Sequence, residues 1–392
     1  MKRRPLPRFF PQRHSRPRAD FLFDPLDCSP EKGTPPVTSR LPQLPRRGIF
    51  AALLTLCLTL VPAATSNARS LSPSAAPAPL VHLPADQAAH SNVKNEWWYV
   101  VGHLRSGRRT FGYEMTIFKF IGVKPPGFNS TLSIFRTDIA ITDENGHRFY
   151  HEITPYFPQS AVYSTHGLSI QVGNARLRGS SLGHMSLKAS LPAGSFNLTL
   201  SSKRRPMYVG GRGYLPFGTG YTYYYSLTDL ATSGILTLHH RRYVTTGISW
   251  LDHQWGDWSW KSISGWTWMC LQLDNGVQLS AFDFRGYGRR TRAASVLRQN
   301  GSLVTDPGAT ITPGGAWVSP HTAGRYPAGV TVHVPSVKAT LSVRPTLADQ
   351  EVVWPLEVRG SYWEGSSRVS GTYDGKRVSG DAYLELTGYA RG

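Results

Sequence analysis

From about residue 92 onward, apolar and polar positions alternate in short runs of the kind that form β-strands. Representative runs are EWWYVVGHL (96–104), FGYEMTIFKF (111–120), YTYYYSL (221–227) and AYLELTGY (382–389). Gly, Asn, Asp and Pro interrupt these runs about every 8–12 residues, which is typical of antiparallel barrels and sandwiches. In this part of the chain no run of 12 or more residues has helical periodicity. The pattern therefore predicts an all-β protein.

Hairpin-type turns separate several of the predicted strands. They occur in DENG (143–146), LDNG (273–276) and TYDGK (372–376). Asn-Gly and Asp-Gly pairs favour tight turns between antiparallel strands, because the central residues must adopt positive φ. The predicted strands are too numerous for one barrel of about eight strands. We therefore expect two tandem antiparallel β-barrels, formed by residues 86–250 and 251–392.

The first 85 residues do not follow the strand pattern. Residues 1–47 hold 11 Lys or Arg and 4 Asp or Glu, and we expect a basic, disordered prefix. Residues 48–68 carry no charge, follow two arginines and end in small residues, as a signal for export does. We expect a periplasmic or secreted protein; the alternative is a membrane anchor formed by residues 48–64. The Ser-, Ala- and Pro-rich stretch 69–85 is predicted to be an unfolded linker.

The net charge of +19 is distributed rather than concentrated. Beyond the prefix, basic residues occur in short clusters such as KRRP (203–206) and GRRTR (288–292). We therefore expect a solvated basic surface and no nucleic-acid binding; attraction to an anionic membrane surface is the second interpretation. After residue 68 the sequence contains the single cysteine Cys270, which excludes an intramolecular disulfide and a cysteine-based metal site there.

Tryptophan is concentrated in the stretch SWLDHQWGDWSWKSISGWTWM (249–269), which holds six of the eleven in the chain. A buried indole needs a partner for its N–H group, so a core rarely needs this many tryptophans, and the stretch is either packing, a ligand-lining wall or a reaction chamber. His253 and Trp255 share one face of the predicted strand, because alternate residues of a strand do so. His253 is either a core residue or part of a site. Tyr223 belongs to a tyrosine face that is either core or a ligand-lining wall.

Asp283 is a candidate acid on the predicted strand LSAFDFR (279–285). Leu279 and Ala281 share its face, and a phenylalanine flanks it on each side. A carboxyl group in an apolar pocket has a raised pKa and can stay protonated near neutral pH. Asp283 could therefore donate a proton. The alternative is an ordinary ion pair with Arg285 or with a basic residue across the sheet.

Several blocks of the chain together resemble a known family. LPADQAAHSNVKNEWWYVVGHL, GISWLDHQWGDW and GWTWMCLQLDNGVQL are similar, in order and spacing, to the carotenoid 1,2-hydratases (hydroxyneurosporene synthases) and AttH-like proteins. The resemblance covers roughly residues 80–392 and implies two lipocalin-like barrels in tandem. It also implies acid-catalysed hydration of a C=C bond in an apolar polyene, with Asp283 as the proton donor and His253 as its catalytic partner. Ala281 departs from the family pattern, in which hydratases carry a tyrosine.

Hydration of an isolated double bond needs an acid, one controlled water and walls that tolerate a carbocation. Indole faces stabilise cations, so we expect substrate contacts from the following aromatic residues: Trp97, Tyr223, Trp255, Trp266 and Trp268. The chemistry requires no metal and no organic cofactor, and the sequence contains no recognised metal-ligand spacing. The alternative function is a non-enzymatic, exported carrier. In both cases the partner is a hydrophobic small molecule, such as a carotenoid, another isoprenoid or a lipid; the oligomeric state stays open.

Overall fold

A computed structural model of the chain describes residues 78–123, 130–354 and 360–390. The predictions for residues 1–47, 48–68 and 69–77 lie outside the described residues. The described part consists of strands, turns and short 3-10 helices, so the prediction of an all-β fold is confirmed. The 3-10 helices have three residues each: η1 Ala85–Gln87, η2 Pro158–Ser160, η3 Trp260–Ser262 and η4 Pro335–Val337. No helix among the described residues is long and apolar enough to cross a membrane.

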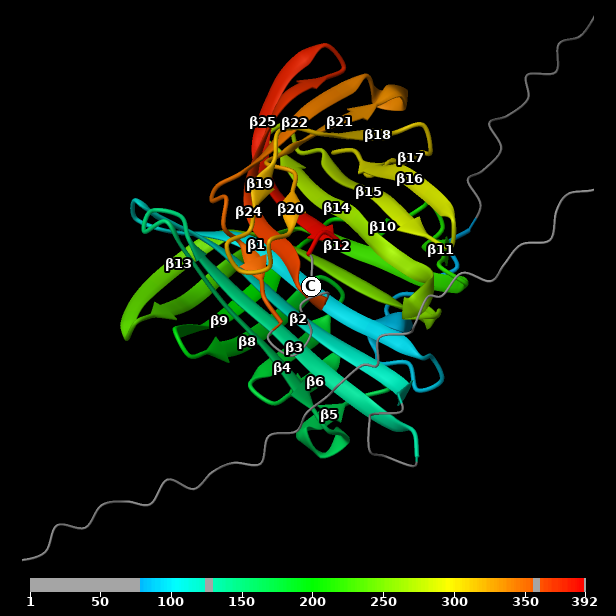
Figure 1. Ribbon diagram of the computed structural model, residues 1–392, viewed down its shortest axis with the longest axis vertical. Helices are drawn as coiled ribbons and strands as arrows, with labels where there is room; N and C mark the ends of the chain where they lie inside the picture. Colours follow the sequence, from blue (N-terminus) through cyan, green and yellow to red (C-terminus); the bar gives the residue numbers. More distant parts are fainter. Residues whose placement is uncertain (1–77, 124–129, 355–359, 391–392) are drawn as a thin grey trace, which may run out of the picture. The chain divides into compact units, whose positions relative to one another are not determined.

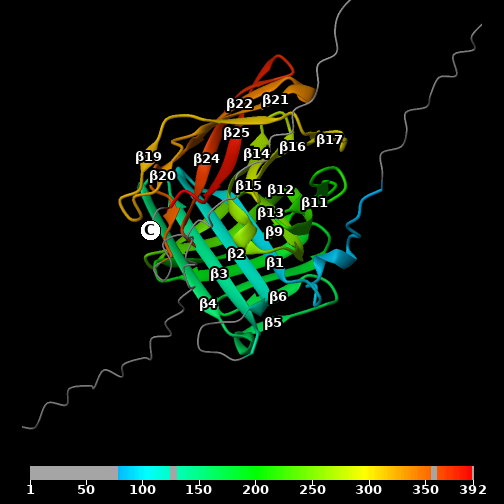
Figure 2. The same ribbon diagram turned by 45° about the vertical axis from the view of Figure 1, so that its right-hand side comes forward.

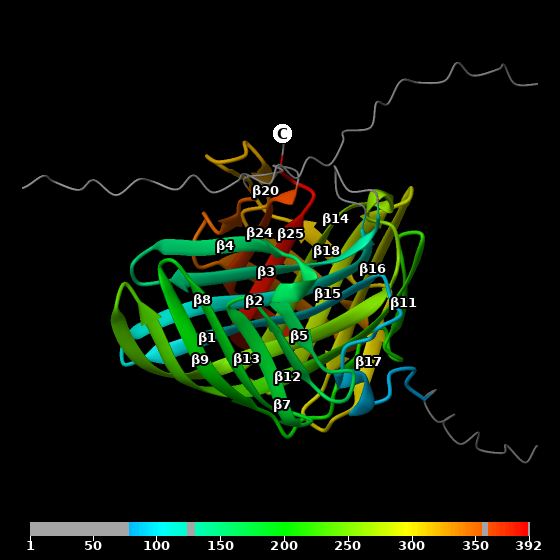
Figure 3. The ribbon, with the colours of Figure 1, turned by 90° about the horizontal axis from the view of Figure 1, so that it is seen from below.

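The first sheet has 13 strands and curls into a nearly closed barrel (Figure 3). Its strands are β1 Asn95–Ser106, β2 Arg109–Val123, β3 Leu132–Asp143, β4 Arg148–Tyr156, β5 Ala161–Tyr163, β6 Ser169–Val172, β7 Ala175–Ser181, β8 His184–Leu191, β9 Gly194–Ser201, β10 Met207–Tyr208, β11 Tyr214–Phe217, β12 Gly220–Leu238 and β13 Arg241–Asp257. The order is β4-β3-β2-β1-β13-β12-β9-β8-β7-β6-β5, with β10 and β11 paired to β12. The pairing of β1 with β13 brings the two tryptophan-containing segments of the barrel together.

The second sheet has 10 strands and forms a half-barrel (Figures 1 and 2). Its strands are β14 Ile263–Leu273, β15 Gln278–Gly286, β16 Arg289–Leu297, β17 Leu303–Asp306, β18 Thr310–Pro313, β21 Val330–Val334, β22 Ala339–Pro345, β23 Glu351–Val352, β24 Tyr362–Tyr373 and β25 Lys376–Thr387. The order is β17-β16-β15-β14-β25-β24-β22-β21-β18, with β23 paired to β24. A separate two-stranded sheet pairs β19 Trp317–Val318 with β20 Arg325–Tyr326.

The hairpin turns lie where the sequence predicts them. DENG (143–146) connects β3 to β4, LDNG (273–276) connects β14 to β15, and TYDGK (372–376) connects β24 to β25. At the last turn Asp374 has φ 47° and Gly375 has φ 75°. These are the two positive φ values that a tight hairpin turn requires, so the Asp-Gly pair matches its local backbone.

Burial patterns divide the strands into two kinds. In outer strands such as β8 and β21, buried and accessible residues alternate, as expected for a sheet with one face toward solvent. In β1 and β13, consecutive residues on both faces are buried. These strands therefore pack against apolar residues on each side.

The packing forms three buried layers. The first core lies on the inner face of the first sheet and includes Trp98, Leu251 and Trp255. The second core lies on the inner face of the second sheet and includes Met269 and Leu279. The interlayer lies between the two sheets and consists of these buried residues: Tyr99, Val101, Met207, Val209, Tyr224, Trp250, Trp268, Cys270, Leu297 and Tyr383. The same β1 and β13 therefore present alternate residues to the first core and to the interlayer.

Two sequence-based boundaries need correction. The predicted linker 69–85 is folded at its C-terminal end, because Val81 is buried in the first core and the Leu80 N–H donates to the Arg212 carbonyl at 2.8 Å. The predicted barrel boundary at 250/251 falls inside β13, which continues in the first sheet to Asp257. The first strand of the second sheet begins at Ile263. The tryptophan-rich stretch 249–269 therefore contributes to strands of both sheets.

Candidate functional site

The predicted site residues are distributed over all three layers. His253 and Trp255 face the first core, where Tyr223 packs partly buried against Trp255, with 5.6 Å between ring centroids. The indole of Trp268 belongs instead to the interlayer, and those of Trp97 and Trp266 are partly buried against it. Asp283 shares a strand face with Leu279 and Ala281, both in the second core. The structure thus does not bring Asp283 together with His253, because the interlayer separates the two cores.

The environment expected for Asp283 is wrong in one respect. The side chain is buried, but its carboxylate accepts hydrogen bonds from Arg290 Nε at 2.7 Å and from Arg292 Nε at 3.0 Å. Burial would raise the pKa of Asp283, but the bonds and charges of the two guanidinium groups outweigh it and lower the pKa below 3.8. Asp283 is therefore an ionised partner in an ion pair, which was the alternative interpretation. Its catalytic role stays a prediction.

His253 lies in a polar group inside the first core, which we call the histidine–glutamate cluster. Its members are Asp86, His90, Glu96, Lys119 and His253. Glu96 of β1 is central, because its Oε1 lies 2.8 Å from His90 Nδ1 and 3.0 Å from His253 Nε2. Lys119 Nζ donates to Glu96 Oε2 at 2.5 Å. Glu96, Lys119 and His253 are all completely buried.

Aromatic rings enclose this cluster. The His253 ring stacks on Trp98 with 4.8 Å between centroids, and the His90 ring stacks on Trp255 with 4.2 Å between centroids. Burial would raise the pKa of Glu96, but the hydrogen bonds from His253 and His90 and the charge of Lys119 lower it to about 2. Burial lowers the pKa of His253 below 6.5. Glu96 is therefore ionised and His253 neutral near pH 7, so Glu96 cannot serve as a proton donor.

Carboxyl groups of a different kind gather in and beside the interlayer. We call them the interlayer acid cluster, and its members are Glu114, Asp138, Asp252, Glu364 and Glu385. Tyrosines connect the sheets reciprocally through this cluster. Tyr99 of the first sheet donates to Glu364 Oε1 of the second at 2.9 Å, and the Tyr362 hydroxyl of the second sheet lies 2.7 Å from Asp138 Oδ2 and 3.1 Å from Glu114 Oε1 of the first.

The interlayer acids hold their protons more tightly than ordinary carboxyl groups. Burial, followed by the charges of neighbouring carboxyls, raises the pKa of Glu114 and of Glu364 well above 4.5. Burial also raises the pKa of Asp252 and of Glu385 to about 7. Glu364 and Glu385 stand directly opposite each other on β24 and β25, an arrangement that is unfavourable for two charges. Near neutral pH the cluster therefore contains protonated carboxylic acids.

Glu385 combines this acidity with partial accessibility. Its side chain is half-buried, whereas Glu114, Asp138 and Glu364 are completely buried. The neighbouring Trp266 favours the ionised form of Glu385 and so opposes the rise in its pKa, and Trp268 lies opposite Glu385 on β14. The Trp268 indole N–H donates to the Tyr224 hydroxyl at 3.0 Å, and that hydroxyl donates in turn to Asp252. Two of the predicted aromatic residues thus lie beside an acid that sequence reasoning did not select.

Several buried polar atoms of the cluster have no hydrogen-bond partner among the described residues. They are Glu114 Oε2, Asp138 Oδ1, Glu364 Oε2 and the Tyr383 hydroxyl oxygen. A buried polar atom without a partner costs about 1–3 kcal/mol, so native proteins seldom keep several together without a reason. Their convergence from both sheets marks the interlayer as the place where a water or a polar substrate group would find partners.

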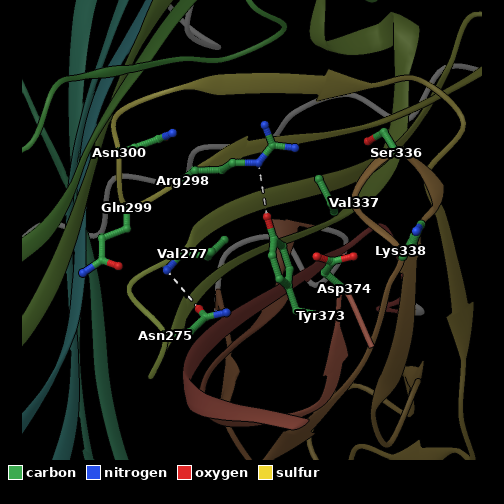
Figure 4. A pocket seen from close by; sticks show the side chains of 10 residues that line it. All are labelled: Asn275, Val277, Arg298, Gln299, Asn300, Ser336, Val337, Lys338, Tyr373 and Asp374. Atoms are coloured by element: carbon green, nitrogen blue, oxygen red, sulfur yellow. Dashed lines mark hydrogen bonds between the residues drawn. The ribbon is translucent and has the colours of Figure 1, made fainter. Parts of the chain in front are cut away.

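A cavity of about 860 Å³ lies elsewhere, at the turns of the second sheet (Figure 4). Its lining comes from the β14–β15, β16–β17 and β24–β25 connections and from η4. Arg298 Nε donates there to the Tyr373 hydroxyl at 3.4 Å, and amides and Lys338 make up much of the rest. The described lining residues include no indole, and Asp374 is the single carboxyl group among them. This cavity does not fit the acid chemistry that the sequence predicts.

The acids that sequence reasoning missed lie in the same kind of sequence as Asp283, which is a predicted strand of mainly apolar residues. Glu114 in FGYEMTIF, Glu364 in SYWEGSS and Glu385 in AYLELTGY each interrupt a strand of aromatic and aliphatic residues. Strand alternation assigns each to a face, but it does not say what covers that face. The sequence therefore could have identified these glutamates as candidate acids. It could not have shown that they differ from Asp283 in protonation state, because the arginine partners of Asp283 come from the neighbouring strand β16.

Comparisons with known proteins point to one family. The AttH-like family model matches residues 74–389. The crystal structure of an AttH protein from Nitrosomonas europaea is 25% identical with a TM-score of 0.70, covering 80% of this chain and 100% of that one. Kievitone hydratase from Nectria haematococca is 20% identical with a TM-score of 0.67, covering 81% of this chain and 94% of that one.

A curated relative matches part of the chain. It is the dehydratase asqC of Emericella nidulans, 24% identical over 215 residues, which are 52% of this chain and 60% of that protein. The chain thus covers less than two thirds of the length of that relative.

Proposed function

The chain belongs to the AttH-like family, and from this premise we propose that it is a hydration-type enzyme with its proton donor in the interlayer acid cluster. The reaction is the acid-catalysed addition of water to a C=C bond of an apolar isoprenoid or polyene, as in the carotenoid 1,2-hydratases, or the reverse elimination. The relationship to a dehydratase and the fold shared with a hydratase support this reaction class.

The observation that carries the proposal is the half-buried Glu385 carboxyl, whose pKa is raised to about 7 beside two indoles. A general acid works best when its pKa lies near the working pH. Protonation of an isolated alkene creates a tertiary carbocation, and the faces of Trp266 and Trp268 can stabilise that charge. The deep acids Glu114 and Glu364 keep negative charge from accumulating beside the donor, because they are protonated as well.

The proposed step balances in atoms and charge. The O–H bond of Glu385 breaks while a C–H bond forms at the less substituted alkene carbon, leaving the cation on the more substituted one. The oxygen of one water then bonds to that carbon, and a proton of this water returns to the Glu385 carboxylate. The net reaction is alkene plus water giving a tertiary alcohol, with the acid regenerated. Elimination of water from such an alcohol follows the same path backward.

Two matched amide substitutions test the proposal. Purified protein is incubated with neurosporene or lycopene in detergent, and the water adduct is measured by mass spectrometry. We expect Glu385→Gln to lower the rate by about 100-fold or more, the scale of lost general-acid catalysis. Asp283→Asn should keep most of the activity. Loss of activity in Asp283→Asn but not in Glu385→Gln would instead make Asp283 the donor and overturn the interlayer site.

The second candidate function is a non-enzymatic carrier of a hydrophobic ligand. It is favoured by the tyrosine and tryptophan faces of the barrel, where Tyr223 and Trp255 stack. Tight binding of the polyene without any water adduct, in wild type and variants alike, would support the carrier and refute the enzyme.

A further inference from the structure

Three ligand-type atoms converge inside the first barrel, apart from the proposed acid site. His90 Nδ1, Glu96 Oε1 and His253 Nε2 all lie within 4.8 Å of one another. The Glu96 oxygen is 2.8 Å from the His90 nitrogen and 3.0 Å from the His253 nitrogen. Donor atoms about 2.1 Å from one tetrahedral ion stand about 3.4 Å apart, so shifts of about 0.5 Å would bring the Glu96 oxygen and the two histidine nitrogens to the spacing of a shared ion.

The atoms come from separate parts of the fold. His90 precedes β1, Glu96 lies near the start of β1, and His253 lies on β13, where its neighbour across the sheet is Trp98. Their convergence is therefore a product of tertiary structure. Trp255, stacked on His90, and Trp98, stacked on His253, limit the directions that the two imidazoles can take.

Outer contacts hold two of the three groups in the orientation that a ligand needs. Asp86 Oδ1 lies 3.6 Å from His90 Nε2, on the side of the ring opposite Nδ1, and Asp86 is itself fixed by the His82 N–H at 2.6 Å. Lys119 Nζ binds Glu96 Oε2 at 2.5 Å, which leaves Oε1 for the two histidines. Metal-bound histidines and carboxylates commonly have such outer partners, and these partners raise metal affinity.

We propose that His90, Glu96 and His253 form a binding site for a divalent transition-metal ion of the zinc type. Two imidazole nitrogens and one carboxylate oxygen are a donor set suited to Zn²⁺ and its first-row neighbours, whereas Ca²⁺ and Mg²⁺ prefer oxygen ligands. Three protein ligands leave a further position for water. The ion would tie the segment around η1 to β1 and β13, and Asp86 and Lys119 would act as positioning residues.

The competing arrangement is a closed hydrogen-bonded network in which the Lys119 ammonium is the only cation beside Glu96. Lys119 also donates to the His90 carbonyl, so it already joins two of the proposed ligand residues. The two arrangements differ in one measurable property, because a closed network takes up no metal.

The test uses the purified full chain without an affinity tag, stripped with a chelator and titrated with Zn²⁺ by calorimetry. We expect one ion per chain. His90→Ala should weaken binding by tenfold or more, since this half-buried ligand can be removed without emptying the core. Asp86→Ala should weaken it by about 10–100-fold through the lost outer contact. The matched control His184→Ala removes an exposed histidine on β8 and should change nothing.

A second readout separates a specific site from loss of folding. Co²⁺ replaces Zn²⁺ and reports its ligands through visible absorption, which should appear with wild type and disappear with His90→Ala while both proteins keep the same circular dichroism. Absence of stoichiometric Zn²⁺ uptake by wild type would overturn the proposal in favour of the closed network. Equal affinities of wild type and His90→Ala would also overturn it, because the ion would then sit elsewhere.

Discussion

The two groups of buried carboxyls in this protein hold opposite charge states. In the histidine–glutamate cluster, Glu96 is surrounded by an ammonium and two imidazoles, and its pKa is lowered to about 2. In the interlayer acid cluster, Glu385 is surrounded by indoles, hydroxyls and other carboxyls, and its pKa is raised to about 7. Burial is common to both, so burial alone does not decide the protonation state. The neighbouring groups decide it.

This difference also separates the two proposals. An ionised carboxylate with imidazole neighbours is equipped to bind a cation, while a protonated carboxyl with indole neighbours is equipped to donate a proton to an apolar substrate. Strand β1 contributes to both regions, because Glu96 and Trp98 face the first core and Trp97 and Tyr99 face the interlayer. Four experiments test this contrast.

The largest effect should follow from Lys119→Met. Both Lys119 and Glu96 are completely buried, and removal of one partner leaves the other charge without its counterion. We expect the free energy of unfolding to fall by about 3–5 kcal/mol, measured by urea denaturation at pH 7. Lys188→Met, which removes an exposed lysine on β8, is the control. A loss no larger than that of the control would show that Glu96 does not depend on this cation.

Tyr362→Phe should have the next largest effect. Its hydroxyl contacts Asp138 and Glu114, so its removal leaves two buried carboxyls of the first sheet without their partner from the second. We expect a loss of about 1–3 kcal/mol in the free energy of unfolding. Tyr287→Phe, at an exposed position, should be neutral. Equal stability of the two variants would mean that the sheets do not need this link.

The pH dependence of stability should have opposite signs in the two regions. The folded protein keeps the Glu385 proton up to about pH 7, whereas the unfolded chain releases it near pH 4.5. Between these values the folded state binds more protons, so the free energy of unfolding falls as pH rises, by about 1.4 kcal/mol per pH unit for each such group. Glu96, with a pKa of about 2, instead contributes stability that is lost as pH falls from 4.5 toward 2.

Urea denaturation of wild type and Glu385→Gln between about pH 5 and pH 8 measures this sign. The variant should have a flatter profile, because it no longer carries the titrating carboxyl. Parallel profiles would show that Glu385 titrates with an ordinary pKa and would remove the basis for its role as an acid.

The smallest effect is expected for Glu364→Gln. The side chain is protonated in the folded protein, so a neutral amide of the same shape replaces it closely, and we expect a change below about 1 kcal/mol at pH 7. The same substitution at Glu96 removes a buried charge beside Lys119 and should cost several times more. Similar costs for the two substitutions would abolish the proposed contrast in charge state.

Sequence reasoning predicted the strands, the hairpin turns and the family, and these are confirmed. Each depends on local patterns: alternation along a strand, Asn-Gly or Asp-Gly at a turn, and short motifs in a constant order. Reasoning from such local patterns predicted the functional site less well than the fold. It selected Trp266 and Trp268, which lie beside the interlayer acids, but it combined them with Asp283 and Trp255, which face different cores.

The sequence alone determined which residues alternate along each strand, and therefore which side chains share a face with Glu96, Asp283 or Glu385. The groups that lie across from that face follow from the tertiary structure. Two arginines on β16 meet Asp283, a lysine and two histidines meet Glu96, and indoles and other carboxyls meet Glu385. The reason is physical: a strand sets the direction of its side chains through local backbone geometry, whereas the pKa of a buried carboxyl depends on charges and hydrogen bonds from residues distant in the chain.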